Sequence, residues 1–451
     1  MKPIPEILLY NTRTRAKAPF VPLDAGHVRL YLCGTTVYDL AHIGNARNVV
    51  LFDILVRLLR LKFPRVTYVR NITDIDDKIN ARAAATGESI HEVTEKTAKA
   101  YQEDMEALYA RQPDVEPRAT GHIPEIIDIA ERLIANGHAY EAEGHVLFAV
   151  KSDPDYGKFS GRSLEDLLAG ARVDVAPYKR DAGDFVLWKP STPDLPGWDS
   201  PWGRGRPGWH IECSAMAHKH LGENFDIHGG GYDLIFPHHE NEIAQSCGAF
   251  PGSHFANVWV HNRMLQLNGE KMSKSLGNFL TVRDAREMAP GEVIRLMLIR
   301  AHYRSTLEFL ESGLEEAKKE LDRFYRAVAA HPEASAAEDV PDEVLLPLCD
   351  DLNTPGAITG LHALADAAFA GDAAAASKLL AAGKIVGLLN VTPAEWFHGD
   401  ENVAAIEKLI AERSAARAAK DFARADKIRK KLEDARILLE DSPTGTTWRK
   451  L

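Results

Sequence analysis

A strand, a loop, a helix and a second strand follow one another near the start of this chain, and this order constrains the fold most. Residues 28–33 (VRLYLC) predict a strand, and the turn-like segment GTT follows it. Apolar residues from Val49 to Leu59 then recur at helical spacing, before a strand-like segment, VTYVRNITD, begins at Val66. The order predicts an α/β fold built on a Rossmann-like, doubly wound parallel sheet.

An insertion interrupts this pattern from about residue 113. A helical segment (IPEIIDIAERLIANG) leads into the strand-like HVLFAV and then into a stretch rich in Pro, Gly, Asp and Trp that continues to Arg206. About 90 residues are too many for a plain loop. The α/β pattern resumes with a helix in PGWHIECSAMAHKHLG, a strand in FDIH and a loop in GGG.

The last third of the 451-residue chain is helical and Ala-rich from about Ala301, with a turn-like gap from Ala330 to Pro341. The final segment, ILLEDSPTGTTWRKL, predicts two short strands around a turn. We therefore expect an α/β domain in two halves, at 1–112 and 207–300, with the insertion between them at 113–206. A helical bundle at 301–395 and a small C-terminal module at 396–451 should follow.

Composition excludes several classes of protein. No apolar run is long enough for a signal peptide or a membrane span, so we expect a soluble, cytoplasmic protein. The four cysteines lie far apart without a C-x-x-C pair, which argues against a disulfide framework and against a local zinc finger. The net charge of −11 means that any nucleic acid must bind to a locally basic face.

The segment FPHHENEIAQS, residues 236–246, concentrates possible metal ligands. If a helix begins at its proline, His238 and Glu242 stand at i and i+4 and project from one face. Cys33 would lie at the carboxyl end of the first strand, and Cys213 on the helix after the insertion. Two thiolates, an imidazole and a carboxylate suit zinc better than magnesium or calcium.

The same residues allow a plainer interpretation, in which the cysteines are small buried hydrophobes and the histidines cap a helix. Two known zinc chemistries do not fit the segment. It contains no H-E-x-x-H of a metalloprotease, and His238-x-Glu240 is not followed by the P-C-x-x-C of a nucleobase deaminase. The spacing alone leaves the presence of a metal open.

Two further segments suit a nucleotide. The KMSKS segment from Lys271 to Ser275 places two lysines and two serines where a polyphosphate could be neutralised, although solvated Lys/Ser loops are common. The HIGN segment from His42 to Asn45 lies where the first helix should begin, and a helix amino terminus attracts phosphate. There is no G-x-x-x-x-G-K-[ST], so the chain is not a P-loop enzyme.

Together these two segments resemble the HIGH and KMSKS motifs of class I aminoacyl-tRNA synthetases, in the expected order and on either side of an insertion. Within that class the chain resembles the cysteinyl-tRNA synthetase family nearly end to end. The resemblance rests on YLCGTTVYDLAHIGNAR, NITDIDDK, PGWHIECSAM, DIHGGGYDLIFPHHENEIAQS, NGEKMSKSLGN, KDFARADKIR and GTTWR. It implies an enzyme that uses ATP, with Mg²⁺, to convert L-cysteine to cysteinyl-adenylate and then acylates the 3′ end of the cysteine tRNA, first on the 2′-hydroxyl.

The resemblance also implies roles for particular residues. It implies a zinc ion held by Cys33, Cys213, His238 and Glu242, to which the substrate thiolate binds. A thiol on zinc deprotonates readily, whereas a serine hydroxyl has a far higher pKa, so an editing domain would be unnecessary. The expected ATP contacts are His42, Gly44, Asn45, Lys271 and Lys274, and the candidates beside the amino acid are Trp209 and Asp233.

The sequence departs from the family at Asn45, which stands where HIGH has its second histidine. An asparagine amide can still donate a hydrogen bond to a phosphate, so we expect activity to survive.

A basic face is predicted near the C-terminus. From Arg413 to Leu432, eight Lys or Arg side chains stand against two Asp, a local net charge of +6. In the family this region and the terminal module contact the tRNA anticodon, and the expected contacts are Arg417, Lys420, Arg424, Lys427, Trp448 and Arg449. The alternative is a solvated helix face, because Asp421 could cap a second helix and divide the basic stripe.

Other functions remain to be weighed. A cysteine ligase of mycothiol synthesis uses the same activation chemistry, but such ligases lack the tRNA-binding tail. A non-catalytic RNA-binding paralogue would be expected to lose metal ligands or KMSKS lysines, and none is missing. A hydrolytic zinc enzyme would need an open metal site with a general base, which no segment indicates. No obligate protein partner is expected.

Overall fold

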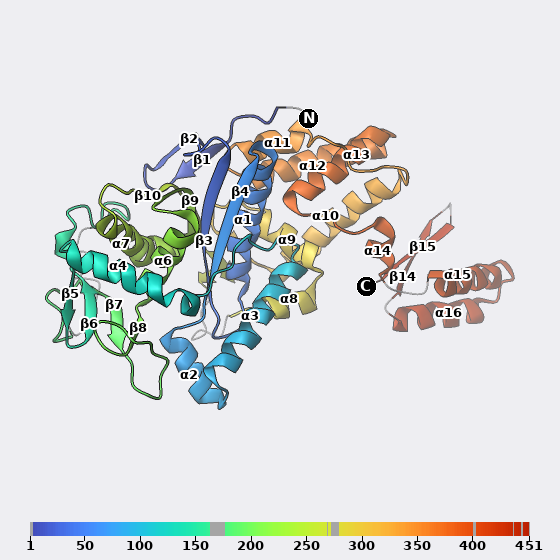
Figure 1. The fold of residues 1–451 in the computed structure, drawn as a ribbon. Coiled ribbons are helices and arrows are strands. Elements are labelled where there is room, and N and C mark those ends of the chain that lie inside the picture. The colour runs from blue at the N-terminus through green and yellow to red at the C-terminus, as the bar shows by residue number, and fades with distance from the viewer. Residues whose placement is uncertain are drawn as a thin grey trace.

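Four parallel strands form the centre of the molecule. The computed structural model describes residues 3–162, 176–267, 269–271, 279–399, 403–435, 437–442 and 445–450. The sheet has the order β10-β9-β3-β4 (Figure 1), and its strands are β3 (His27–Thr36), β4 (Arg65–Thr73), β9 (Asn224–Gly231) and β10 (Phe255–Asn262). Helix α1 (Ile43–Lys62) connects β3 to β4. This architecture confirms the predicted Rossmann-like α/β class.

The strands extend further than the sequence predicts. The segment GTT, predicted as a turn, completes β3, whose register with β4 shifts between Leu32 and Thr35. The GGG segment, predicted as a loop, forms the end of β9 and pairs with β10 from Val260 to Asn262. Glycine is needed there because a Cβ on Gly229 would overlap the ring of Phe52 on α1. Close packing of helix on strand therefore overrides the turn preference of glycine.

Gly34 offers a direct test of this packing. A Cβ at this position would overlap the backbone carbonyl of Asn71 on β4, so Gly34→Ala should force β3 and β4 apart. We expect a loss of about 1–3 kcal/mol in the free energy of unfolding, measured by urea denaturation. Gly121→Ala is the matched control, because no heavy atom lies within 4 Å of its added Cβ. An equal loss in both variants would show that the β3–β4 contact is not the cause.

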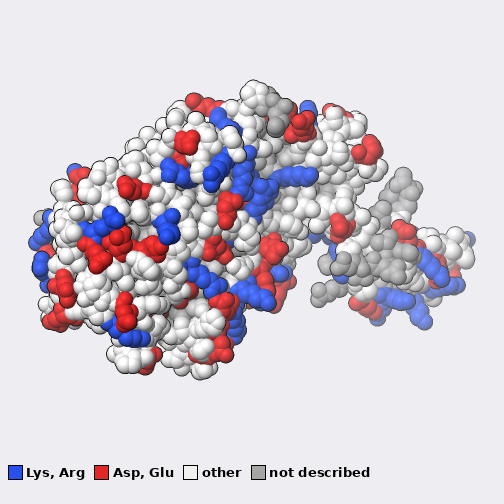
Figure 2. Space-filling model, viewed as in Figure 1, with Lys and Arg blue, Asp and Glu red and all other residues white. Residues whose placement is uncertain are grey.

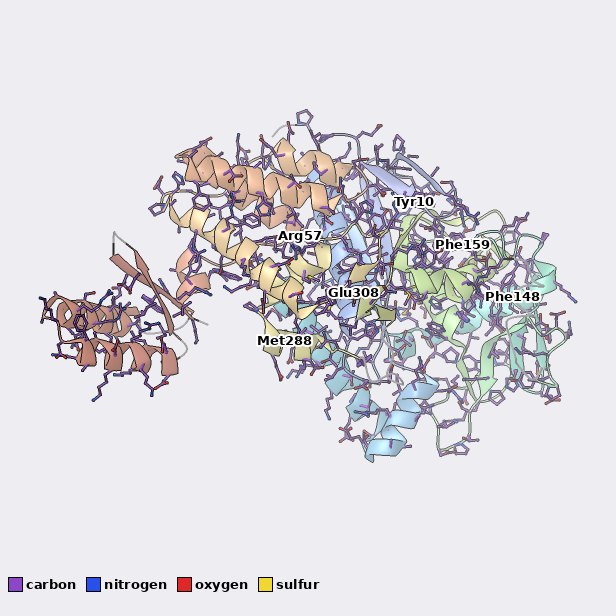
Figure 3. The ribbon with its side chains drawn as sticks, turned by 180° about the vertical axis from the view of Figure 1, so that it is seen from behind. Tyr10, Arg57, Phe148, Phe159, Met288 and Glu308 are labelled. Carbon is purple, nitrogen blue, oxygen red and sulfur yellow. The ribbon has the colours of Figure 1, made fainter. Side chains whose placement is uncertain are left out.

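The insertion lies between β4 and the second half of the sheet. After α2 (Asp77–Thr86) and α3 (Ile90–Ala107), helix α4 (Ile123–Ala135) leads into an antiparallel sheet of order β5-β6-β7-β8. Its strands are β5 (Ala139–Ala142), β6 (His145–Phe148), β7 (Phe185–Pro190) and β8 (Gly205–Pro207). Phe148 and Trp188 belong to an apolar cluster of this region, and Figure 3 shows Phe148 in the part of the molecule opposite the C-terminal module. Helix α6 (Trp209–Leu221) returns the chain to the central sheet.

Helices form most of the C-terminal third. They are α8 (Val282–Met288), α9 (Gly291–Ile299), α10 (Glu311–Ala329), α11 (Asp342–Cys349), α12 (Thr354–Phe369), α13 (Ala373–Val386) and α14 (Pro393–His398). The predicted gap from Ala330 to Pro341 separates α10 from α11. Short strands β1 (Leu8–Asn11), β2 (Ala16–Pro19), β11 (Leu265–Leu267), β12 (Glu270–Lys271) and β13 (Leu307–Glu308) lie elsewhere in the chain. This arrangement confirms the predicted helical region.

A buried ion network joins the sheet to this helical region. Asp53 of α1 accepts hydrogen bonds from Arg57 Nε (2.8 Å) and from Arg295 Nη2 of α9 (2.5 Å). Both arginines also donate to backbone carbonyls near the end of α13, those of Lys384 and Val386. Three helices are thus tied together through one carboxylate.

The C-terminal module stands apart from the bundle in Figure 1. Helices α15 (Val403–Ala418) and α16 (Phe422–Asp434) pack beside the antiparallel pair β14 (Ile437–Ser442) and β15 (Gly445–Lys450). The two predicted terminal strands are confirmed. Within the described ranges, no helix combines the length and the apolar character that a membrane crossing requires.

Candidate active site

Four residues from distant segments converge at the carboxyl end of β3. They are Cys33 of β3, Cys213 of α6, His238 of the π-turn Ile235–His239 and Glu242 of α7 (Glu240–Ala249). All four are buried, and one ligand atom from each lies within 4.8 Å of the others. The structure therefore brings together the whole predicted ligand set.

The separations match the dimensions of a tetrahedral zinc site. Two sulfurs bound to one zinc at about 2.3 Å would lie about 3.8 Å apart. The Sγ atoms of Cys33 and Cys213 are 3.9 Å apart, and Cys33 Sγ is 3.4 Å from Glu242 Oε1. His238 Nε2 lies 2.7 Å from the same oxygen, a hydrogen-bond distance. Only a small widening of this last pair would admit an ion.

Burial and the neighbouring charges shift the pKa values of the cluster in different directions. Burial alone would lower the pKa of His238, but the Glu242 carboxylate raises it to about 10. Burial acts to raise the pKa of Glu242, but His228 and His238 hold it well below its usual value. The pKa of Cys213 falls to about 6 because its sulfur accepts a hydrogen bond from Cys33. Cys213 and Glu242 are therefore ready as anionic ligands, whereas His238 and Cys33, whose own pKa burial raises, would each release a proton when a metal binds.

A second possible ligand set shares two of these residues. Cys33, His228, His239 and Glu242 also lie within reach of one ion. His228 Nε2 is 2.5 Å from Glu242 Oε2, which is the arrangement of a residue that orients a ligand. The first set has both thiolates, and therefore suits zinc better.

The helix that carries His238 and Glu242 begins later than predicted. The segment from Ile235 to His239 forms a π-turn in which Phe236 has an extended backbone (φ −139°, ψ 132°), and α7 starts at Glu240. The condition of a helix that begins near Pro237 is met only approximately, because α7 starts three residues later. His238 and Glu242 nevertheless contact each other, because the π-turn leads directly into α7.

The neighbouring residues of this segment hold the insertion against the site. Glu240 accepts hydrogen bonds from the backbone N–H groups of Gly157 (2.9 Å) and Ser160 (2.7 Å). Asn241 Oδ1 accepts a hydrogen bond from the Tyr156 hydroxyl at 2.6 Å. These two polar residues thus have structural partners within the insertion.

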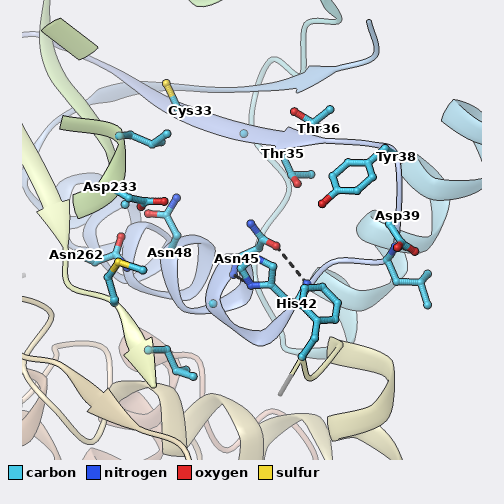
Figure 4. Close-up of a pocket in the computed structure, with 18 of the residues that line it drawn as sticks. Cys33, Thr35, Thr36, Tyr38, Asp39, His42, Asn45, Asn48, Asp233 and Asn262 are labelled. Atoms are coloured by element: carbon cyan, nitrogen blue, oxygen red, sulfur yellow. Dashed lines mark hydrogen bonds between the residues drawn. The ribbon is translucent and has the colours of Figure 1, made fainter. Parts of the chain in front are cut away.

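A cavity of about 330 Å³ opens beside the cluster, and Cys33 forms part of its wall. Figure 4 shows His42 and Asn45 on one side of it, and Asp233 on the other. His42 is the N-cap of α1, and its backbone N–H donates to Asn45 Oδ1 at 3.1 Å. Gly44 also lines the cavity. The predicted nucleotide segment thus faces the predicted metal cluster across one space.

Trp209 forms another wall of this cavity. Its side chain is 41% exposed, so it is not a core residue, and its ring stacks on His238 at 4.4 Å between centroids. His238 in turn lies 2.9 Å from His210 through their Nδ1 atoms. Burial lowers the pKa of His210 to about 3, so its ring is neutral, and His238 Nε2 faces Glu242. A stacked indole and a fixed imidazole therefore border the cavity.

The KMSKS segment is described only at its first residue. Lys271 ends β12, and Lys274 lies outside the described residues. Phe279, just after this segment, packs edge-on against the ring of His42 at 5.4 Å between centroids. The segment therefore leads to the start of α1.

The C-terminal module corrects one predicted contact. Trp448 is only 6% exposed and stacks on His398 within an apolar cluster, so its ring faces are not available to a base. The neighbouring Arg449 is half-buried. The residue types of Trp448 and Arg449 do not indicate which face of β15 packs against the rest of the module.

Ion pairs reduce the predicted basic stripe. Arg417 lies 3.0 Å from Asp441, and Arg424 lies 3.7 Å from Glu412. Asp421 caps α16 and divides the stripe, as the alternative interpretation allowed. Lys420 and Lys427 are exposed, and Figure 2 shows Lys and Arg gathered along the α16 edge of the module.

Phe422 is a candidate that sequence reasoning missed. It is 62% exposed at the start of α16, between the basic residues Lys420 and Arg424. An exposed aromatic ring flanked by cations is the arrangement that unpaired bases stack on. The sequence feature that could have indicated this role is its position in the KDFAR segment, between two basic residues.

The fold and the site together define a class I aminoacyl-tRNA synthetase. The profile of the tRNA synthetases class I (C) catalytic domain matches residues 19–319. Among solved structures, the chain is similar to the Mycobacterium tuberculosis methionyl-tRNA synthetase in complex with methionyl-adenylate, with a TM-score of 0.56 and 15% identity over 80% of this chain and 89% of that one. It is also similar to a leucyl enzyme of Agrobacterium radiobacter in a ternary complex, with a TM-score of 0.57 and 11% identity over 82% and 83% of the two chains. At such identities these likenesses show the fold alone.

Closer relatives narrow the class. The cysteine–tRNA ligase of Acidiphilium cryptum is 68% identical over 446 residues, 99% of each chain, and that of Gluconobacter oxydans is 62% identical over 442 residues, 98% of each chain. The profile of the cysteinyl-tRNA ligase anticodon binding domain matches residues 400–449. The chain belongs to the cysteine–tRNA ligase family.

Proposed function

We propose that this enzyme activates L-cysteine with ATP and Mg²⁺ and transfers the cysteinyl group from cysteinyl-adenylate to the 3′ end of the cysteine tRNA, first to the 2′-hydroxyl. The observation that supports this most is that the Cys33, Cys213, His238 and Glu242 cluster borders, through Cys33, the cavity where α1 begins. An amino acid side chain at the cluster would have its carboxylate near a nucleotide at the helix amino terminus.

The four cluster residues would hold a zinc ion. Zinc bound there would accept the substrate side chain as a thiolate ligand, which a serine hydroxyl cannot provide at neutral pH. Trp209 would cover the small side chain, since its ring lies against His238 at the cavity wall. Asp233, across the cavity, would bind the substrate ammonium or the ATP ribose.

The remaining residues would bind the nucleotide and the tRNA. His42, Gly44 and Asn45 would contact ATP at the start of α1, and Lys271 and Lys274 would neutralise the phosphates. Positioning and charge stabilisation would carry adenylate formation, without a covalent enzyme intermediate. The face of the C-terminal module that carries Lys420, Phe422, Arg424 and Lys427 would bind the anticodon.

Cysteine-dependent ATP–pyrophosphate exchange tests the activation step. We expect exchange with cysteine to exceed exchange with serine by about 10⁴-fold, because selection rests on ligand chemistry and not on pocket size. Acylation of the cysteine tRNA is measured beside it on the same protein. Exchange without tRNA acylation would favour a cysteine ligase with another acceptor, and absence of exchange would favour a non-catalytic protein.

A further inference from the structure

A second cavity, of about 280 Å³, adjoins the first. Its wall combines the β1–β2 hairpin, the insertion, the end of β10 and the segment after α9. Figure 3 shows Tyr10 of the hairpin close to Phe159 of the insertion, and both line this cavity. Arg263 lines both cavities, so the two cavities lie next to each other at this residue.

The lining of the second cavity is basic. Arg15, Arg263 and Arg304 line it, and the described lining contains no carboxylate. Arg304 donates from Nε to Asp351 at 2.8 Å, which fixes its side chain, and Asp351 itself is buried. Three guanidinium groups with one neutralising carboxylate leave an excess of positive charge. The cavity therefore suits an anion.

Two of these arginines are paired with aromatic rings. The Arg263 guanidinium lies 3.9 Å from the centroid of Tyr232, a ring that is 43% exposed. Arg304 lies 4.5 Å from the centroid of Tyr10. Unpaired nucleotides are recognised by rings and guanidinium planes that stack on bases, combined with cations that bind the phosphodiester. Both elements are present here.

The position of Arg15 is determined by its surroundings. Its backbone has a left-handed conformation (φ 55°), and its N–H donates to the carbonyl of Asn11 at 2.8 Å. Its guanidinium occupies the space that a Cβ on Gly161 would fill. The insertion and the hairpin thus hold this arginine at the cavity between them.

We propose that the second cavity binds one unpaired nucleotide near the 3′ end of the acceptor RNA. The arginines bind its phosphodiester, and Tyr10 or Tyr232 stacks on its base. This inference rests on the proposed function, since it assigns a place to the acceptor strand in the transfer step. An RNA held here would extend past Arg263 toward the amino acid cavity.

The test separates transfer from activation. Arg15→Gln should lower kcat/KM for the cysteine tRNA about tenfold while ATP–pyrophosphate exchange stays within about twofold of the wild type. The logarithmic salt dependence of tRNA binding should become shallower by about one unit, as the loss of one phosphate contact requires. The control is Arg65→Gln, an exposed arginine at the amino end of β4, which should change neither reaction.

A second pair of variants tests stacking. Tyr10→Leu should reduce tRNA acylation as Arg15→Gln does, and Tyr10→Phe should restore it, because phenylalanine keeps the ring. Titration with inorganic phosphate distinguishes a free anion from RNA. Arg15-dependent phosphate binding with unchanged tRNA kinetics would assign the cavity to a free anion and overturn the inference.

The wild type is assayed for exchange and acylation in parallel. If Arg15→Gln loses exchange and acylation equally, the cavity serves the activation step. If it loses neither, no RNA binds there. Either result overturns this inference but leaves the proposed function intact. Absence of exchange in the wild type overturns the proposed function as well. The two failures are therefore distinguishable.

Discussion

His238→Ala protein should be purified without the zinc that we propose for the wild type, and its cysteine-dependent ATP–pyrophosphate exchange should fall by more than about 100-fold. Loss of a residue that merely supports a metal ligand costs about 10–100-fold, and His238 supplies a donor atom itself. Removal of the imidazole also takes away the partner that lies 2.7 Å from Glu242. Elemental analysis of the purified protein and initial exchange rates measure the two effects.

His91→Ala is the control for this experiment, because His91 is exposed on α3, far along the chain from the cluster. It should keep both metal and activity, and thermal unfolding should show that both variants are folded. If His238→Ala retains the metal and His228→Ala loses it, the second ligand set, which includes His228 and His239, holds the ion instead.

Asp53→Asn should lower the free energy of unfolding by about 3–5 kcal/mol, the usual cost of removing one partner from a buried ion pair. The substitution keeps the shape of the side chain but leaves Arg57 and Arg295 without their carboxylate. Arg295 is fully buried, so water cannot solvate its guanidinium group once the carboxylate charge is lost. The urea concentration at the unfolding midpoint, at pH 7, measures the effect.

Asp128→Asn provides the matched control, since Asp128 pairs with Arg132 at the same 2.8 Å but both side chains are about half exposed. An exposed pair of this kind contributes less than about 1 kcal/mol. A loss at Asp53 no larger than the loss at Asp128 would mean that the network does not stabilise the junction of sheet and bundle.

The pH dependence of this effect has a definite sign. Burial acts to raise the pKa of Asp53, but the charges of Arg295 and Arg57 outweigh it and hold the pKa below its ordinary value. The carboxylate therefore stabilises the fold fully above its unfolded pKa of about 3.9, and loses this contribution as the pH falls through the lower, folded pKa. The difference between wild type and Asp53→Asn should be constant near neutrality and shrink only below about pH 4.

Local patterns were sufficient to predict most elements of the α/β fold, because helical and strand periodicities depend on neighbouring residues. The contact of His238 with Glu242 was expected from i, i+4 spacing on one helix, but the structure forms it across the junction of the π-turn and α7. Cys33 and Cys213 are 180 positions apart, and only the arrangement of β3 and α6 brings their sulfurs to 3.9 Å. Sequence spacing alone therefore did not decide whether a metal is bound, and the family resemblance supplied the ligand set.

The features that could not be predicted depend on contacts between distant segments. Gly229 continues a strand because Phe52 of α1 packs on it, and no local rule contains that contact. Trp448 is buried because His398 and the helices of the module cover it, whereas Phe422 is exposed. Residue type alone did not separate these two aromatic residues.

The capping bonds at the start of α1 also determine a tautomer. His42 Nδ1 accepts a hydrogen bond from the backbone N–H of Asn45 at 3.3 Å, so a neutral imidazole must carry its proton on Nε2. Asn45 Oδ1 accepts from the backbone of His42, which leaves the amide hydrogens on Nδ2. The remaining polar hydrogens of these two side chains are on His42 Nε2 and Asn45 Nδ2, and both residues line the cavity. Groups of this kind donate hydrogen bonds to the oxygen atoms of a phosphate.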